Sequence, residues 1–129
     1  NKKWPYFKEL ISELKKYYKN KYPILLAPGP KEIEEASKLN GKIVLDNNKP
    51  INIKILVSLI NESKFIIAND TGPAHIASHL DKRGLVLFGN HTTAKKVSIE
   101  NFNFKAITVK NLADLNAEAV LKELKKSLD

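Results

Sequence analysis

The sequence predicts an α/β protein with a doubly wound, mostly parallel sheet of the Rossmann type. Short apolar runs typical of buried strands recur along the chain, and segments with helical apolar spacing separate them. One such run, at residues 65–68, ends in a polar turn followed by a proline that suits a helix start. We therefore expect five strands alternating with helices, in one domain over residues 1–129.

The first half of the chain is expected to hold two strands among three helices. Asn52 is placed to cap the third helix, and four apolar residues are expected on the buried side of that helix. In order, the elements are a helix at 5–19, a strand at 24–27, a helix at 31–39, a strand at 43–45, a loop at 47–50, and a helix lined by Ile53, Leu56, Val57 and Ile60.

The second half continues the alternation. Pro73 suits the first position of a helix because its missing N–H would have no partner there. In order, we expect the strand at 65–68, a helix from Pro73, a strand at 85–88, a polar irregular segment at 89–104, a strand at 105–109, and a final helix capped by Asn116.

The turn after residues 65–68 is the strongest functional signal. A helix N-terminus at the carboxyl end of a parallel strand offers unpaired N–H groups, and open α/β sheets bind phosphates there. Thr71 supplies a hydroxyl, Gly72 permits close approach, and His75 lies in the first turn of the helix. Asp70 is suited to sugar hydroxyls, because a carboxylate repels phosphate. On these residues alone, simple capping by Asp70 or Thr71, with His75 packed on the sheet, is an equal alternative.

The composition narrows the function classes. The net charge is +8, from 22 Lys+Arg against 14 Asp+Glu. Such a charge is suited to an anionic partner, which could be a nucleotide diphosphate, an anionic lipid surface or nucleic acid. The alternative is that most of the lysines only solvate helix faces. The absence of cysteine excludes disulfides and thiol nucleophiles, and no carboxylate and histidine cluster has metal-ligand spacing, so neither metal nor cofactor is expected.

The lack of membrane-spanning and signal segments bears on where the protein is located, and the lack of methionine bears on whether the sequence is part of a longer one. No apolar run approaches the ~18 residues of a membrane span, and no signal peptide is evident. We expect a cytoplasmic protein, peripheral at most to the inner membrane. Since the sequence has no methionine, we expect it to begin inside a longer protein.

Four motifs resemble the heptosyltransferases, family 9 of the glycosyltransferases. Asn-Asp-Thr-Gly-Pro-Ala-His at 69–75 and Gly-Leu-Val-Leu-Phe-Gly at 84–89 are similar to the family signature, and Lys-Trp-Pro at 3–5 and Gly-Pro-Lys-Glu at 29–32 to two further motifs. The resemblance covers nearly the whole chain, but only the C-terminal, donor-binding half of a two-domain GT-B enzyme. It implies transfer of heptose from ADP-heptose to the lipopolysaccharide inner core.

The resemblance also implies which residues bind the donor. The general base would be a carboxylate of an N-terminal domain, which would also bind the lipid-linked acceptor, so no catalytic residue is assigned here. Asn-His-Thr-Thr at 90–93 departs from the family's Pro-Thr and bears on sugar or acceptor selectivity. The implied contacts are Lys3 with phosphates or sugar, Glu32 with ribose hydroxyls, Pro50 and Ile51 with adenine, and Asp70, Thr71, Gly72 and His75 with sugar and pyrophosphate.

Each of these roles has a plainer alternative in the residues themselves. On these residues alone, Glu32 as a first-turn acid that favours the helix dipole is an equal alternative, and Lys3 as a solvated terminal residue is the plainer one. For Pro50 and Ile51 the alternative is that they are loop and core residues.

The chain opens on a helix, whereas the resemblance and the Rossmann strand order imply a central strand just before residue 1. Without it, the strands at 24–27 and 65–68 lack a shared neighbour, and their backbone groups stay unpaired. We expect either that another segment or chain fills the gap or that these two strands pair directly.

Two other functions remain as alternatives. One is a GT-B transferase with a different donor, such as a UDP-sugar. The other is a non-catalytic, basic nucleotide-binding module, which would bind nucleic acid in a salt-sensitive way without preferring ADP-sugars. Under the main prediction there is no specific nucleic-acid partner.

Overall fold

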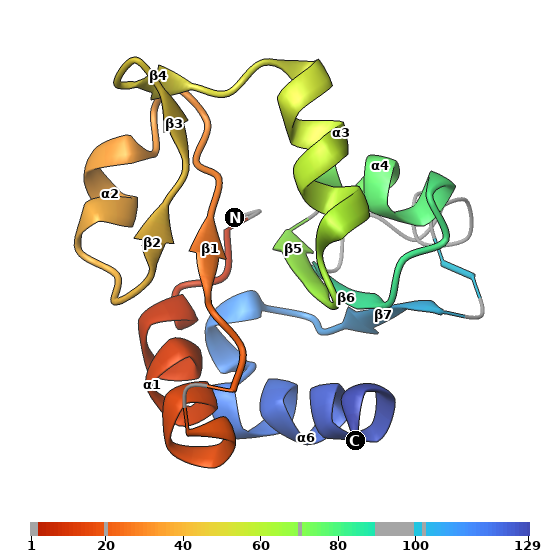
Figure 1. The fold of residues 1–129 in the computed structure, drawn as a ribbon. Helices are drawn as coiled ribbons and strands as arrows, with labels where there is room; N and C mark the ends of the chain where they lie inside the picture. The colour runs from red at the N-terminus through yellow and green to blue at the C-terminus, as the bar shows by residue number, and fades with distance from the viewer. Residues whose placement is uncertain (1–2, 20, 70, 90–99, 102) are drawn as a thin grey trace.

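The computed structural model describes residues 3–19, 21–69, 71–89, 100–101 and 103–129. Helices and strands alternate along much of these residues, but three short strands follow one another at residues 42–50, where the sequence predicts one strand and a loop (Figure 1). The elements are α1 (Phe7–Tyr18), β1 (Leu25–Leu26), α2 (Ile33–Ser37), β2 (Lys42–Ile43), β3 (Leu45–Asp46), β4 (Lys49–Pro50), α3 (Ile53–Glu62), β5 (Ile66–Asn69), α4 (Gly72–His79), β6 (Gly84–Phe88), β7 (Phe104–Thr108), the 3₁₀ turn η1 (Leu112–Asp114) and α6 (Ala117–Leu128).

The strands form three separate groups. β5, β6 and β7 make a parallel sheet in that order, in which Ile66 pairs with Gly84 and Gly84 with Phe104. β1 and β2 form a second parallel pair, and β3 and β4 form an antiparallel hairpin. The α/β class and the parallel pairing are confirmed, whereas the single continuous sheet is not formed by the described residues.

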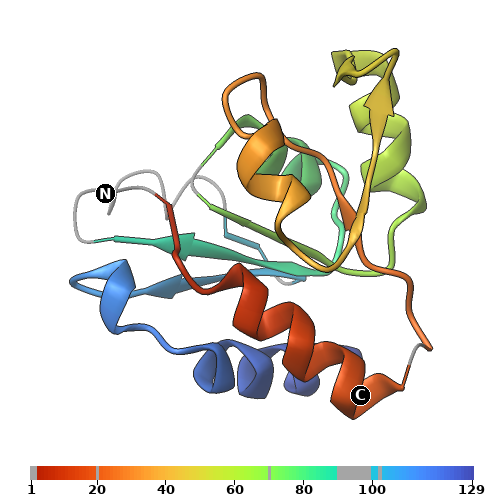
Figure 2. The same cartoon turned by 90° about the vertical axis from the view of Figure 1, so that its left-hand side faces the viewer.

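Helices cover both faces of the three-stranded sheet, so the doubly wound arrangement is confirmed. α1 and α6 lie on one face, and α3 and α4 lie on the other (Figures 1 and 2). Successive side chains of β6 point to opposite faces because a strand alternates with a period of two. Leu85 and Leu87 pack against α6 and its neighbours, while Val86 and Phe88 pack with Ala74 and Ala77 of α4.

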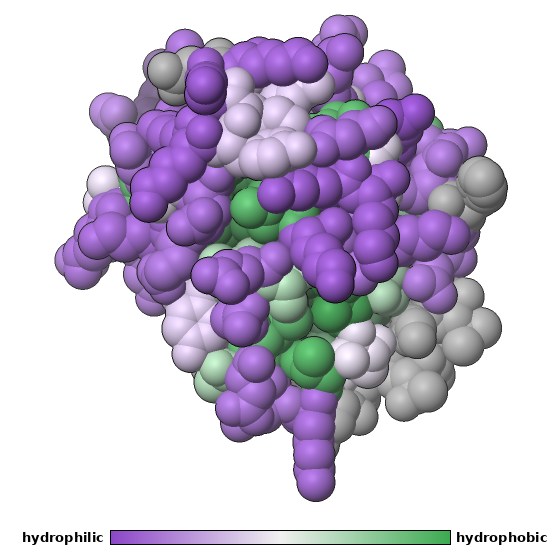
Figure 3. Space-filling view, turned by 90° about the horizontal axis from the view of Figure 1, so that it is seen from below, coloured by the Kyte–Doolittle hydropathy of each residue, from purple (hydrophilic) through white to green (hydrophobic). Residues whose placement is uncertain are grey.

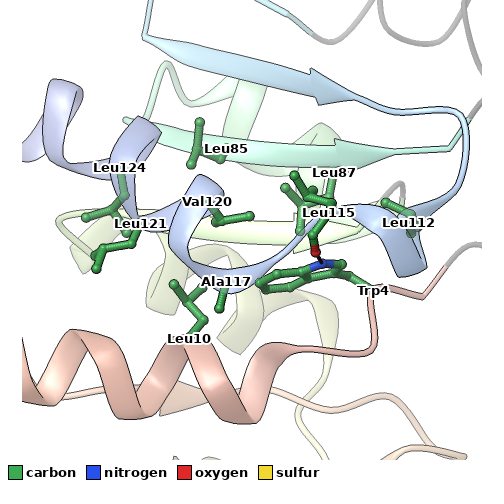
Figure 4. Close-up of a cluster of buried hydrophobic side chains, with 10 residues drawn as sticks. All are labelled: Trp4, Leu10, Leu85, Leu87, Leu112, Leu115, Ala117, Val120, Leu121 and Leu124. Carbon is green, nitrogen blue, oxygen red and sulfur yellow. Dashed lines mark hydrogen bonds between the residues drawn. The ribbon is translucent and has the colours of Figure 1, made fainter.

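The larger core cluster joins the two helices below the sheet to β6 (Figure 4). Trp4 is only 2% exposed, and its indole Nε1 donates a hydrogen bond to the carbonyl of Leu115 at 2.6 Å. The rings of Tyr6 and Phe7 lie edge-on to the indole. The sequence segment before α1 is therefore anchored in the core, and this aromatic group is structural.

The carboxylate of Asp129 joins the C-terminal ends of α1 and α6. The hydroxyls of Tyr17 and Tyr18 each donate to Asp129 at 2.8 Å. These hydrogen bonds hold the pKa of Asp129 below its usual range. The same carboxylate raises the pKa of Tyr17, while burial is the main cause that raises the pKa of Tyr18.

The surface seen from below, on the side of α1 and α6, is largely hydrophilic, with apolar side chains gathered in its middle (Figure 3).

Local signals placed two helix caps correctly, whereas α1 and α2 each begin two residues later than predicted. The side chain of Asn52 accepts a hydrogen bond from the N–H of Ile55, and that of Asn116 accepts one from the N–H of Ala119. Each satisfies an N–H that has no partner within its helix. Both predicted caps are confirmed.

Two expectations about residues 47–60 are wrong. The predicted loop is instead a hairpin, in which Asn47 and Asn48 adopt positive φ angles of 51° and 65° between β3 and β4. Two such angles define the tight turn whose twist matches a hairpin, and asparagine tolerates them. Ile53 is 65% exposed rather than buried, whereas Ile60 of the same helix is 5% exposed, as expected.

The predicted direct pairing of the two parallel strands at 24–27 and 65–68 is also wrong. Among the described residues, β1 pairs only with β2 and β5 pairs only with β6. A cavity of about 820 Å³ lies between them, with α1 and α2 also contributing to its wall. The expectation that another segment fills this gap stays a prediction.

Candidate functional site

The site is built where β5 ends and α4 begins. Thr71 is the N-cap residue of α4, and Pro73 stands in the first turn as predicted. The Thr71 side chain makes no capping bond to the helix; its hydroxyl lies 3.3 Å from the carbonyl oxygen of Asn69 and donates to it. Thr71 therefore does not cap the helix through its hydroxyl, which remains close to the carboxyl edge of the sheet.

This turn is open rather than covered by the described part of the chain. Thr71 and Gly72 are exposed, and beyond the neighbouring backbone of α4 no heavy atom of the described residues lies within 4 Å of the place where a Cβ on Gly72 would stand. His75, in the first turn of α4, is half-buried, and its backbone N–H donates to the carbonyl of Thr71 at 3.4 Å. A ligand can approach the backbone at Gly72 closely, and the positive end of the helix dipole lies there.

A second group of site residues lies beside α2. Glu32 is the N-cap residue of α2, and its Oε1 accepts the N–H of Gly29 at 3.0 Å. Its Oε2 lies 3.3 Å from Nζ of Lys3, and the carboxylate of Glu35 lies 3.8 Å from the same ammonium. The Lys3 and Glu32 side chains are 50% and 42% exposed, so the pair contributes little to stability. The structure thus brings two of the predicted binding residues into contact.

Asn69 links the two groups and was not among the predicted binding residues. Its side-chain oxygen accepts the backbone N–H of Trp4 at 3.0 Å, and its carbonyl accepts the Thr71 hydroxyl. Residues 3–4 therefore reach from α2 to the end of β5. They lie at the end of the molecule where β6 and β7 have their carboxyl ends (Figure 2). The signal available in the sequence was the position of Asn69 as the last residue of a buried strand.

No side-chain hydrogen bond or ion pair between described residues joins the remaining predicted residues to this group. Pro50 closes β4 and Ile51 follows it, and both are half-buried. Asp70 and the segment at 90–93 lie outside the described residues. Within the described ranges, no three His, Asp or Glu side chains come together as a metal site. Nor is any helix formed by those residues long and apolar enough to cross a membrane.

Three comparisons place this geometry among known proteins. The model of glycosyltransferase family 9 (heptosyltransferase) matches residues 1–125. Comparison with curated proteins returns no significant match. Among solved structures, the chain is similar to Escherichia coli heptosyltransferase WaaC with ADP-2-deoxy-2-fluoro heptose, at a TM-score of 0.81 and 22% identity over 97% of this chain and 39% of that one.

Two further structures are similar to the chain. WaaC with ADP matches at a TM-score of 0.77 and 22% identity, over 97% of this chain and 39% of that one. Escherichia coli ADP-heptose lps heptosyltransferase II matches at a TM-score of 0.78 and 22% identity, over 98% of this chain and 42% of that one. The chain thus spans about two fifths of the length of these proteins, and the likeness establishes the fold. With the family model covering nearly every residue, the chain belongs to glycosyltransferase family 9, the heptosyltransferases.

Proposed function

We propose that residues 1–129 form the nucleotide-sugar donor domain of a glycosyltransferase that transfers heptose from ADP-heptose to the lipopolysaccharide inner core. The observation that carries the proposal is the exposed turn of Thr71 and Gly72 at the start of α4, beyond the carboxyl edge of the β5–β7 sheet. The Lys3–Glu32 pair is joined to the end of β5 through the bond of the neighbouring Trp4 to Asn69. Open α/β sheets bind nucleotides at this edge. Membership of family 9 and the ADP-bound state of the similar WaaC structure support the choice of donor.

In this proposal the diphosphate binds at the N-terminus of α4. Gly72 lets a phosphate oxygen reach the backbone, and the Thr71 hydroxyl can turn from the Asn69 carbonyl to donate to it. His75, in the first turn of the helix, would contribute a ring nitrogen to the same anion. Charge develops on the leaving diphosphate as the sugar departs, so these fixed donors stabilise the transition state more than the ground state.

Lys3 and Glu32 would exchange partners when the donor binds. The ammonium of Lys3 lies within 4 Å of both Glu32 and Glu35, and a diphosphate carries more charge than either carboxylate. Movement of Lys3 to the diphosphate would free Oε2 of Glu32 for two ribose hydroxyls. Oε1 would keep the N–H of Gly29, which fixes the orientation of the carboxylate.

The other assignments rest on the family resemblance. Pro50 and Ile51 would contact the adenine, and Asp70 would accept hydrogen bonds from the sugar. The general base and the lipid-linked acceptor would belong to an N-terminal domain. We accordingly expect residues 1–129 to bind the donor weakly and to transfer no sugar, and detectable turnover by this chain would contradict the assignment.

Calorimetric titration of the chain with ADP, UDP and a short oligonucleotide tests the proposal. We expect ADP to bind most tightly, and Gly72→Ala and Thr71→Ala each to weaken it about tenfold, since a methyl group blocks the close approach or a hydroxyl donor is lost. Asp70→Ala tests the sugar contact with an ADP-sugar as ligand. Ser12→Ala on the exposed side of α1 is the control and should leave binding unchanged.

Each alternative function gives a different result. Tighter binding of UDP than of ADP would identify a transferase with another donor. Preference for the oligonucleotide, with affinity that falls steeply as salt rises, would identify a basic nucleic-acid-binding module. Equal ADP binding by Gly72→Ala and the unaltered chain would remove α4 from the donor site.

A further inference from the structure

The side chain of Asn69 lies on the same face of the sheet as Trp4. Asn69 is the last residue of β5, and side chains two residues apart along a strand share a face. Ile67, two residues earlier, packs against the core cluster that contains Trp4. On this face the Asn69 side-chain oxygen accepts the backbone N–H of Trp4 at 3.0 Å, in a partly buried bond. The alternation of β5 thus directs this amide to the segment before α1.

Trp4 is held at its ring and at its backbone. The ring is buried, and its Nε1 donates to the carbonyl of Leu115 (Figure 4). A bond to the ring alone would not fix the backbone, because two side-chain torsions lie between them. The bond to Asn69 fixes the backbone itself, next to Lys3. Pro5 adds to this restriction, because a proline limits the residue before it to extended conformations.

Asn69 also contacts the start of α4. Its backbone carbonyl accepts the hydroxyl of Thr71 at 3.3 Å. Thr71 is the exposed N-cap residue of α4, where the diphosphate is proposed to bind. One residue therefore holds the Thr71 hydroxyl through its carbonyl and the segment of Lys3 through its side chain.

The acceptor for the Trp4 N–H is an amide rather than a carboxylate. A carboxylate would make the stronger hydrogen bond, because its oxygens are charged. At position 69, however, it would add negative charge two residues before Thr71, where α4 offers its positive end to an anion. The uncharged acceptor gives up bond strength and keeps the site suited to an anion, which a role in stability alone does not explain.

Lys3 depends on its backbone for what its ammonium can reach. Its Nζ lies 3.3 Å from a carboxylate oxygen of Glu32 and 3.8 Å from one of Glu35, and its side chain is 50% exposed. The lysine stem is flexible, so these exposed contacts do little to fix its position. Glu32 is oriented separately, because its other oxygen accepts the N–H of Gly29. The bond between Trp4 and Asn69 is therefore the contact that fixes where the Lys3 side chain begins.

We propose that Asn69 is a positioning residue for donor binding. It holds the backbone beside Lys3 so that the ammonium can leave Glu32 and reach a diphosphate at the start of α4. Asn69 acts through Lys3 rather than by binding the donor with its own side chain. The inference rests on the donor assignment proposed above and adds to it the residue that joins the cation to the anion site.

A double-mutant cycle tests this coupling, with ADP binding measured by calorimetric titration. Lys3→Met removes the ammonium and keeps a long side chain, and we expect it to weaken ADP binding about tenfold. Asn69→Ala should weaken it about fivefold. In the double variant Asn69→Ala should add nothing to the effect of Lys3→Met, because the ammonium that it positions is gone.

Asn101→Ala is the matched control. The Asn101 side chain also accepts a partly buried backbone N–H, that of Phe104 at 2.9 Å. It precedes β7, at the amino end of a parallel strand, whereas Asn69 ends β5. Asn101→Ala should therefore lower stability and leave the affinity of the folded chain for ADP unchanged.

Hydrogen exchange measured by NMR gives a second, independent test. Coupling between two sites is reciprocal, so if the Trp4–Asn69 bond favours ADP binding, ADP must favour that bond to the same extent. Saturating ADP should slow exchange of the Trp4 amide about fivefold, the factor by which Asn69→Ala weakens binding. The Phe104 amide, bound to Asn101, should change less.

The outcomes separate this inference from the donor assignment. Additive losses in the double variant, equal weakening by Asn101→Ala and Asn69→Ala, or Trp4 exchange that ADP leaves unchanged would each overturn the positioning role. If Gly72→Ala weakens ADP binding and Asn69→Ala does not, the donor site stands and this inference alone fails. A chain that does not bind ADP would overturn both.

Discussion

Nζ of Lys3 lies 3.3 Å from Oε2 of Glu32, so two residues assigned to different parts of a donor are bound to each other. Both side chains are about half exposed, and such pairs contribute at most about 1 kcal/mol. Glu32→Gln should therefore alter the free energy of unfolding by less than about 1 kcal/mol. It should weaken ADP binding about tenfold, because a carboxylate accepts ribose hydroxyls more strongly than an amide does.

The measurements for Glu32→Gln are urea denaturation and calorimetric titration with ADP. Glu34→Gln is the control, because it makes the same charge change on an exposed residue in the first turn of the same helix. If both variants weaken binding equally, the effect is one of net charge, and Glu32 does not contact the ribose.

Asn69→Ala should lower the free energy of unfolding by about 1–2 kcal/mol, measured in urea. The variant removes the acceptor for the N–H of Trp4, in a partly buried bond between two residues that line the cavity. Asn69→Asp retains an oxygen at this position and should recover most of the loss. Equal destabilisation by both would mean that the bond to Trp4 is not the cause.

Gly84→Ala should destabilise the fold by at least about 2 kcal/mol, which chemical denaturation will measure. A Cβ at Gly84 would collide with the carbonyl of Ile66 in the neighbouring strand and with the ring of Phe104. Gly72→Ala is the control, since its Cβ would meet no described heavy atom within 4 Å beyond the neighbouring backbone of α4. The free energy of unfolding of this variant should change by less than about 0.5 kcal/mol. Equal effects of the two substitutions would contradict the close packing of β5, β6 and β7.

Trp4→Phe should cost about 2–3 kcal/mol, because it leaves the Leu115 carbonyl without its donor and opens a space in the core. Tyr6→Phe removes a hydroxyl that donates to the carbonyl of Ala113 at 2.8 Å in an exposed position. It should cost less than about 1 kcal/mol. Thermal unfolding followed by circular dichroism compares the two, and a larger loss for Tyr6→Phe would contradict the buried role of Trp4.

The bond between α1 and α6 at Asp129 should depend on pH. The pKa of Asp129 is lowered in the folded chain, so its contribution to stability is complete above the ordinary carboxyl pKa and is lost as pH falls below about 4. The pKa values of Tyr17 and Tyr18 are raised, so the tyrosines' contribution is complete below the ordinary tyrosine pKa and is lost as pH rises above about 10.

The measurement is the free energy of unfolding of the unaltered chain and of Asp129→Asn, first between about pH 4 and about pH 10 and then below about pH 4. The difference between the two proteins should shrink as the pH falls, because protonation makes the native side chain resemble the amide. A difference that does not change with pH would show that the carboxylate charge is not involved.

Local chemistry made most of the helices and strands predictable. Asn52 and Asn116 cap their helices, Pro73 lies in the first turn of α4 one residue after the helix begins, and the apolar run of β6 is buried on both faces. Each of these features depends on a few neighbouring residues. By contrast, the exposure of Ile53 depends on which distant segment packs beside α3, and spacing along one helix cannot supply that.

The site was predictable at the level of motifs but not of contacts. Position at a strand end pointed to Thr71 and Gly72, which are indeed exposed at the start of α4. The contact of Lys3 with Glu32 joins segments that are separate in sequence, and it forms only because Trp4 fixes the path of the N-terminal segment. The bond of Asn69 to Trp4 was missed for the same reason.

The β1–β2 pair and the sheet of β5, β6 and β7 differ in how many buried apolar residues pack around them. This difference should make them unequal in resistance to proteolysis. Among the described residues of the segment 21–52, Ala36 alone is a buried apolar residue, whereas the sheet of β5, β6 and β7 is packed on both faces. Regions with few buried contacts open at a lower free energy than the rest of a fold. A protease at low concentration should accordingly cut first between β1 and β4, and the C-terminal portion should survive as a resistant fragment.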